Sequence, residues 1–229
     1  RATASTPTGV VPHFEKMLYD NALLLRAYAH WGGRRTDDPL AFRIAAETAG
    51  FLLNDLAAGG MFISALDADA AGVEGSTYVW TLAQLREVLG DDDGPGRQAF
   101  FAVTDVGTFE HGSRCCSCRR SRRRRTFRAG PRVAPGLPFD AGAAARDDKI
   151  VTAWNGLAIT ALAEASVALD VPPLLTAASR CARALLDLHI VDGRLRRASL
   201  GGVVGDSAGI LEDHAALATG VADALPAHR

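Results

Sequence analysis

Polar and ionisable side chains crowd the beginning of an apolar stretch near the N-terminus of the chain. His13 stands first, and Tyr19, Asp20 and Asn21 follow within about two helical turns. An imidazole and a carboxylate can move protons, and a phenol or an amide can hydrogen-bond a ligand. Two interpretations stay open: a polar cluster that caps a helix, or a ligand site lined by His13, Tyr19 and Asp20 or Asn21.

The same order, a polar cluster followed by an apolar run, occurs twice more. The second cluster lies in 147–155 and the third begins at Glu212. Aligning Asn21, Asn155 and Asp213 superimposes all three copies, so we expect these residues to point toward a common cleft. Further candidate ligand-binding side chains in the two later clusters are Lys149, Trp154 and His214.

An acidic segment follows the first helical region. Asp67, Asp69 and Glu74 lie close together in sequence, but they do not meet the twelve-residue calcium-loop pattern. We expect them to be loop carboxylates at the mouth of a ring of helices. Tyr78 and Trp80 follow, and such rings either stack on a sugar or pack in a core.

Three predicted helices, 14–31, 147–169 and 211–225, must position these clusters. The second is apolar nearly all the way round, and a helix without a polar face is normally buried on all sides. Partner helices are predicted over 39–56 and 173–189, each followed by a Gly-containing loop. Helical hairpins that cannot bury their faces alone stack into an array or close into a ring. The sequence therefore predicts an all-α fold.

The composition excludes several classes of protein. The chain has 229 residues, 48% of them hydrophobic, and a net charge of −1. This charge gives no general attraction to nucleic acid or membrane, and we expect neither as a partner. No signal peptide and no membrane-length apolar span is visible, so we expect a cytoplasmic protein. Four cysteines do not make a secreted disulfide scaffold at this length.

Residues 113–145 break the pattern of the rest of the chain. The segment 113–128 holds eight of the 23 arginines, three of the four cysteines and no acidic residue. It shows no helical or strand period, and its cysteines lack zinc-ligand spacing, so we predict no metal site. We predict four regions: an unstructured tail 1–11, a helical part 12–112, an irregular Arg/Cys-rich linker 113–146, and a second helical part 147–229.

Five motifs, taken together, resemble the thioredoxin-domain-containing family typified by spermatogenesis-associated protein 20. They occur in this order along the chain: 12–22, 64–69, 78–81, 147–157 and 211–215. The resemblance implies a large protein in which a thioredoxin-like domain precedes an (α/α)6 toroid. That toroid is similar to those of acylglucosamine 2-epimerases and six-hairpin glycosidases.

On this resemblance we expect a fragment: an incomplete (α/α)6 toroid of helical hairpins with long loops on one face. Such a fragment would bind or process a saccharide without a cofactor. For a glycosidase, two carboxylates would flank the scissile bond. For an epimerase, His13 or His214 would move a proton next to a carbonyl. The candidate catalytic residues are His13, Asp20, Asp67, Asp69, Glu212 and Asp213. The candidate substrate-binding residues are Tyr19, Asn21, Glu74, Tyr78, Trp80, Lys149, Trp154, Asn155 and His214.

Two alternatives stay open. One is a non-catalytic helical scaffold whose partner would be the thioredoxin-like domain, which this chain lacks. The other is an inactive truncated product, in which residues 113–145 result from a shifted reading frame. Carboxylates at the helix starts favour the carbohydrate hypothesis over a plain scaffold.

Overall fold

The computed structural model describes residues 13–34, 39–70, 72–76, 78–89, 114–115 and 144–225. The chain divides into two compact units. The helical unit consists of Lys16–Asp67 and Arg146–Arg229, and the small unit consists of Ala2–Glu15 and Ala68–Ala145. The predicted tail 1–11 lies outside the described residues, and so does most of the predicted linker 113–146.

The helical unit is built around α5 (Thr152–Leu169), the helix whose sequence offers no polar face. Apolar side chains on every side of a helix can be buried only if neighbours surround it. No residue between Thr152 and Ser166 is exposed, and Ile159 and Leu162 are fully buried. The prediction of an inner helix is confirmed.

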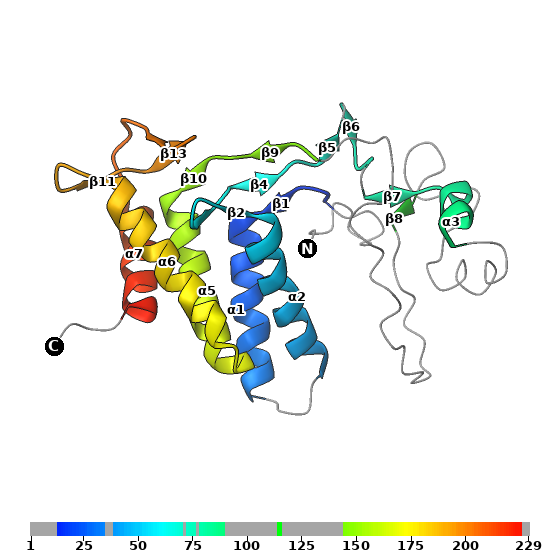
Figure 1. The fold of residues 1–229 in the computed structure, drawn as a ribbon, viewed down its shortest axis with the longest axis horizontal. Helices are drawn as coiled ribbons and strands as arrows, with labels where there is room; N and C mark the ends of the chain where they lie inside the picture. Colours follow the sequence, from blue (N-terminus) through cyan, green and yellow to red (C-terminus); the bar gives the residue numbers. More distant parts are fainter. Residues whose placement is uncertain are drawn as a thin grey trace. The chain divides into compact units, whose positions relative to one another are not determined.

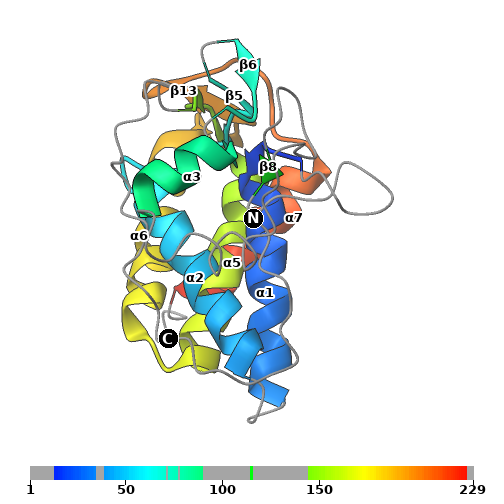
Figure 2. The same cartoon turned by 90° about the vertical axis from the view of Figure 1, so that its right-hand side faces the viewer.

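Four helices pack around α5 in two layers. Alongside it lie α1 (Leu18–Arg34) and α7 (Leu211–Ala224). The second layer consists of α2 (Pro39–Asp55), which packs against α1 and α5, and α6 (Pro172–His189), which packs against α5 and α7. Figures 1 and 2 show α2 and α6 on one side of the layer that α1, α5 and α7 form. The predicted helical hairpins α1–α2 and α5–α6 are therefore present.

Two glycines allow α5 and α7 to cross in direct backbone contact. A Cβ at Gly156 would lie 2.5 Å from the backbone carbon of Ala216. A Cβ at Gly220 would lie 2.9 Å from the carbonyl oxygen of Gly156. Backbone cannot move aside as a flexible side chain can, so any larger residue at either position pushes the two helices apart.

Short antiparallel strands occupy the predicted loops, so the all-α prediction is wrong. After α2, β2 (Ala57–Ala58) pairs with β3 (Met61–Phe62) around Gly59 and Gly60. Both glycines have positive φ, at 58° and 89°. Two residues with positive φ form the tight turn whose twist matches that of paired strands, and Gly-Gly supplies it without strain.

A second hairpin with a two-residue turn follows α6. There β11 (Ile190–Val191) pairs with β12 (Arg194–Leu195) around Asp192 and Gly193, whose φ values are 51° and 71°. Next, β13 (Ala198–Leu200) pairs with β14 (Val203–Val204) around a Gly-Gly turn. Gly-Gly and Asp-Gly between apolar residues are hairpin signals that the surrounding helical periodicity obscures.

Two three-stranded sheets join these hairpins to the helix starts, as Figure 1 shows. One sheet contains β1 (Lys16–Met17), β4 (Ala65–Leu66) and β9 (Arg146–Asp147) in the order β1-β4-β9. In the other, β10 (Ile150–Val151) pairs with β13, which pairs with β14.

These strands correct two predicted helix boundaries. The helix predicted over 147–169 begins only at Thr152, because β9 and β10 occupy the residues before it. The helix predicted from residue 14 begins at Leu18, since Lys16 and Met17 pair with β4. The part of the chain that the structure describes does not form a closed ring of hairpins. No helix among the described residues is long and apolar enough to span a membrane.

The described residues of the small unit form a short helix and two strand pairs. In α3 (Leu82–Leu89), Thr81 and Gln84 form the reciprocal hydrogen bonds of a capping box, at 2.7 and 3.3 Å. The strand pairs are β5 (Asp69–Ala70) with β6 (Val73–Glu74), and β7 (Val79–Trp80) with β8 (Arg114–Cys115).

Gly156→Ala is expected to lower the free energy of unfolding by about 2–3 kcal/mol, because the new methyl group collides with the backbone of Ala216. Gly50→Ala is the matched control, since a Cβ in that mid-helix position of α2 meets only Asn54 Nδ2, at 3.9 Å. This control should raise stability by about 0.5–1 kcal/mol. Urea denaturation of both variants measures the two changes in the free energy of unfolding. Equal changes in the two variants would contradict the close crossing of α5 and α7.

Candidate functional site

The starts of α1, α5 and α7 lie together at one end of the helical unit. The rings of Tyr19 and Trp154, on α1 and α5, have centroids 5.0 Å apart and are inclined at 58°. The amide of Ala153 on α5 donates to Asp213 Oδ1 on α7 at 3.1 Å. The three predicted polar clusters are thus brought together, although Asn21, Asn155 and Asp213 are fully buried.

Asn155 uses its whole side chain to bind protein groups. Its Oδ1 accepts from the amide of Phe62 at 2.8 Å, and its Nδ2 donates to the carbonyl of the same residue at 2.9 Å. The Nδ2 also donates to Val151 O at 3.1 Å, and the Cys181 thiol donates to Oδ1 at 3.4 Å. The amide therefore pairs with β3 as a neighbouring strand would.

Asp213 joins α5 and α7 through one carboxylate. Its Oδ1 accepts from Ala153 N, and its Oδ2 accepts from Ile210 N at 3.0 Å, which closes the first turn of α7. The guanidinium of Arg197 lies 3.7 Å from the same Oδ2. A fully buried carboxylate is stable only with such partners. Asp213 therefore serves the packing of the two helices.

His189 connects the start of α5, the end of α6 and β13. Thr152 Oγ1 donates to Arg196 O at 2.7 Å and lies 2.6 Å from His189 Nδ1. Because a hydroxyl has one proton, Nδ1 carries the hydrogen of this second bond. His189 Nε2 then accepts from the Ser199 hydroxyl at 2.9 Å. Burial lowers the pKa of His189, and the charge of Asp213 only partly opposes this.

The start of α1 is held by similar backbone bonds. Asn21 Nδ2 donates to Met17 O at 2.7 Å, and the amide of Leu18 donates to Ser64 O at 2.8 Å. Ser64 in turn donates from its hydroxyl to Lys149 O at 2.8 Å. These bonds fix the three helix starts, so the buried polar residues position the surface around them.

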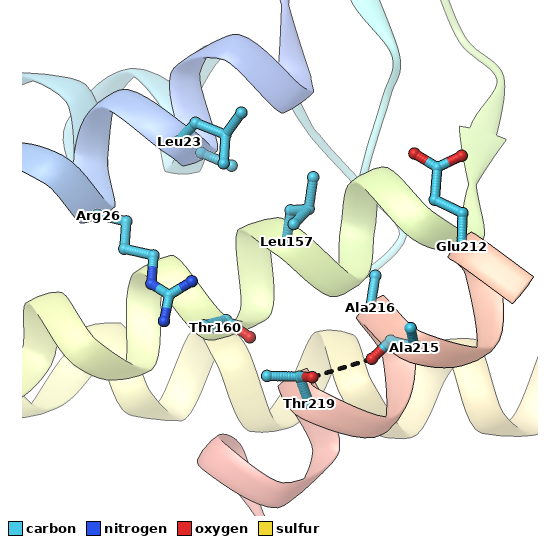
Figure 3. A pocket seen from close by; sticks show the side chains of 9 residues that line it. Leu23, Arg26, Leu157, Thr160, Glu212, Ala215, Ala216 and Thr219 are labelled. Carbon is cyan, nitrogen blue, oxygen red and sulfur yellow. Dashed lines mark hydrogen bonds between the residues drawn. The ribbon is translucent and has the colours of Figure 1, made fainter.

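A groove of about 280 Å³ runs between α1 and α7, with α5 as its floor. We call it the α1–α7 groove, and Figure 3 shows its lining. Leu23, Leu157 and three alanines form apolar walls, whereas Glu212 and Arg26 supply charges. The complete lining is Ala22, Leu23, Arg26, Leu157, Thr160, Glu212, Ala215, Ala216 and Thr219.

Arg26 is held in place by a carboxylate on α5. Its Nε and one Nη donate to Glu164 at 2.7 and 2.8 Å, and His30 Nε2 lies 2.7 Å from the same carboxylate. The hydrogen bond with Glu164 raises the pKa of Arg26. Burial alone would raise the pKa of Glu164, but the bonds from Arg26 and His30 outweigh it and lower that pKa.

The remaining predicted residues of the helical unit are spread around the helix starts. Tyr19 precedes Leu23 by four residues and Trp154 precedes Leu157 by three, so each ring lies one turn before the groove on the same helix face. Asp20 is half-buried in the first turn of α1. The other three lie elsewhere: Asp67 exposed, Lys149 paired with Asp147 at 3.1 Å, and His214 in an apolar hollow between α6 and α7.

Five predicted residues belong to the small unit. His13 lies 3.4 Å from Glu15, and Asp69 and Glu74 are directly opposite each other on β5 and β6. Tyr78 stacks on Phe14, with ring centroids 5.9 Å apart, and Trp80 is half-buried. Among all described residues, no group of three or more His, Cys, Asp or Glu side chains could hold a metal ion.

Of the predicted residues that the structure describes, Glu212 is the one that lines the groove. Sequence reasoning missed Leu23, Arg26, Leu157 and Thr160. Their signal is their helical spacing. Leu23 and Leu157 follow Tyr19 and Trp154 by four and three residues, and Arg26 and Thr160 each come three residues later, on the same helix faces. Inside an apolar run this spacing looks the same as core packing.

No family model matches the chain. Curated relatives do match it. Spermatogenesis-associated protein 20 of Rattus norvegicus is 30% identical over 93% of this chain, and that of Homo sapiens is 28% identical over the same share. An uncharacterized protein of Caenorhabditis elegans is 26% identical over 86% of the chain.

The chain spans about one third of the length of these relatives, 33% of the rat and human proteins. It is thus homologous to a region of spermatogenesis-associated protein 20, and the resemblance carried by the five motifs is confirmed.

The buried His189 predicts an acid-dependent loss of stability. An unfolded histidine takes up a proton near pH 6.5, and the folded one does so only at lower pH. The contribution of His189 is therefore fully present above pH 6.5 and falls as the pH drops through 6.5 toward the folded pKa.

Urea denaturation at pH 7.5 and 5.5 tests this, with His189→Gln and the exposed His214→Gln as a matched pair. The difference in the free energy of unfolding between pH 7.5 and 5.5 should be smaller in His189→Gln than in the unaltered chain. In His214→Gln it should be the same as in the unaltered chain. An undiminished difference in His189→Gln would show that other groups cause the acid effect.

Proposed function

We propose that the α1–α7 groove binds a saccharide, and that the chain is part of a carbohydrate-binding or carbohydrate-processing protein. The observation that carries this proposal is the combination in one groove of apolar walls, hydroxyls and an exposed carboxylate. Small-molecule sites are typically concave and apolar, with a few polar groups that fix orientation. The family resemblance supports the same class of ligand.

The aromatic pair at the head of the groove adds to this support. Tyr19 and Trp154 are half-buried, and each lies one turn before a groove residue on its helix. A half-buried aromatic ring can pack its exposed part on the apolar side of a sugar while its polar atoms bond elsewhere. Trp154, a candidate substrate-binding residue in the sequence, is the ring that we assign to stacking on the sugar.

Glu212 is the carboxylate we assign to the ligand. It lies in the first turn of α7, is exposed, and lines the groove. A charged carboxylate accepts hydrogen bonds from sugar hydroxyls more strongly than a neutral group does. Asp213 beside it is fully buried and bonded to backbone, so the two neighbours have different tasks.

A second candidate function is a non-catalytic helical scaffold for the thioredoxin-like domain that the resemblance implies. The observation in its favour is that Asn21, Asn155 and Asp213 all bind backbone groups within the helical unit. A scaffold of this kind needs no groove ligand. A cytoplasmic location stays a prediction for either candidate.

The test is an NMR titration of the 229-residue chain with neutral mono- and disaccharides. Glu212→Gln should weaken binding about tenfold, because it removes a charge-assisted hydrogen bond worth about 1.5–3 kcal/mol. Because Glu212 is exposed in the first turn of α7, losing its charge should lower the free energy of unfolding by no more than about 0.3–1 kcal/mol.

The matched control is Glu87→Gln, an exposed glutamate on α3 in the small unit, which should bind as the unaltered chain does. An equal loss of saccharide affinity in both variants would contradict binding in the α1–α7 groove. If the unaltered chain shows no shifts at Leu23, Leu157 or Thr219 with any saccharide, the scaffold function gains and the saccharide proposal fails.

A further inference from the structure

One buried hydroxyl in the helical unit has no hydrogen-bond partner in the described part of the chain. Four of the six buried Ser and Thr hydroxyls donate to a backbone carbonyl there, and Ser199 bonds His189. Thr160, with 3% of its surface exposed, is the sixth. A buried polar group without a partner is costly, and an unmade hydrogen bond of this kind calls for an explanation.

The place of Thr160 supplies that explanation. It lies on α5 at the floor of the α1–α7 groove, and Figure 3 draws it with Arg26 on α1 and Thr219 on α7. Thr219 is already committed, because its hydroxyl donates to Ala215 O at 2.9 Å. The Thr160 hydroxyl can therefore donate to, or accept from, whatever occupies the groove.

The charges around the groove limit what that occupant can be. Among the described lining residues, Arg26 carries the positive charge, and Glu164 already pairs with it. Asp223 also acts electrostatically on Arg26, and Glu212 is exposed in the groove. Carboxylates thus outnumber guanidinium groups, so a phosphate or carboxylate on the ligand would be repelled.

We infer that Thr160 is a ligand-binding residue, and that the groove selects an uncharged, hydroxylated ligand of about one sugar ring. The inference rests on the proposed saccharide function and names the ligand class. The volume of about 280 Å³ lies at the small end of ligand sites, which suits one ring. The rim of the groove offers Glu212 to the remaining hydroxyls.

The experiment replaces two buried threonines, Thr160 and Thr48, and measures the ligand affinity and the thermal midpoint of each variant. The probes are methyl glucoside and methyl mannoside as neutral ligands, and glucuronate as the anionic analogue. Thr160→Val keeps the shape and removes the hydroxyl, so affinity for the neutral probes should fall about three- to tenfold. Its thermal midpoint should hold or rise, because an unpaired buried polar group is lost.

The control is Thr48→Val on α2, whose hydroxyl donates to Ile44 O at 2.7 Å. It should lower the thermal midpoint and leave affinity unchanged. Thr160→Ser should restore binding, since it returns the hydroxyl.

Each contrary outcome has a distinct meaning. Unchanged affinity in Thr160→Val, while the unaltered chain binds, overturns the role of Thr160 and leaves the proposed function standing; the hydroxyl then holds a water. Glucuronate binding as tightly as the neutral probes overturns the ligand class. If the unaltered chain binds no probe, the saccharide function and this inference both fail.

Discussion

The start of α5 places polar groups where water does not reach, and the rest of the helical unit depends on how they are satisfied. Asn155 is the central case, because its amide makes paired hydrogen bonds with the backbone of Phe62. The Thr152 hydroxyl and the Ala153 amide find their partners at Arg196 and Asp213. A buried helix start without such partners would lose about 1–3 kcal/mol for each unpaired group.

These bonds also determine where the candidate site lies. They hold α1, α5 and α7 with their starts together, and Gly156 and Gly220 let α5 and α7 cross closely. Asn21, Asn155 and Asp213, which the sequence suggests as ligand-binding residues, therefore stabilise the packing of the helices. The groups left to face a ligand include Thr160, which lies just over one turn after Asn155 on α5, and Glu212, which directly precedes Asp213 on α7.

The sequence predicts the inner helix and its hairpin partners because an all-round apolar run has only one stable environment. It indicates a strand at Val79–Trp80 but does not predict the strands of the helical unit, since two-residue turns such as Gly59–Gly60 leave too little β periodicity beside long helices. The roles of Glu212 and Asp213 could not be separated either. Both suit a helix start, and only the close approach of α5 makes one of them buried.

The most direct test of this account is Asn155→Ala, measured by urea denaturation and by hydrogen exchange at the Phe62 amide. The account predicts a loss of about 2–4 kcal/mol, because both backbone groups of Phe62 lose their buried partner, together with faster exchange at that amide. The exposed Asn54→Ala should stay within about 0.5 kcal/mol of the unaltered chain. If Asn155→Ala is as mild as Asn54→Ala and Phe62 keeps its protection, the central role of this contact is contradicted.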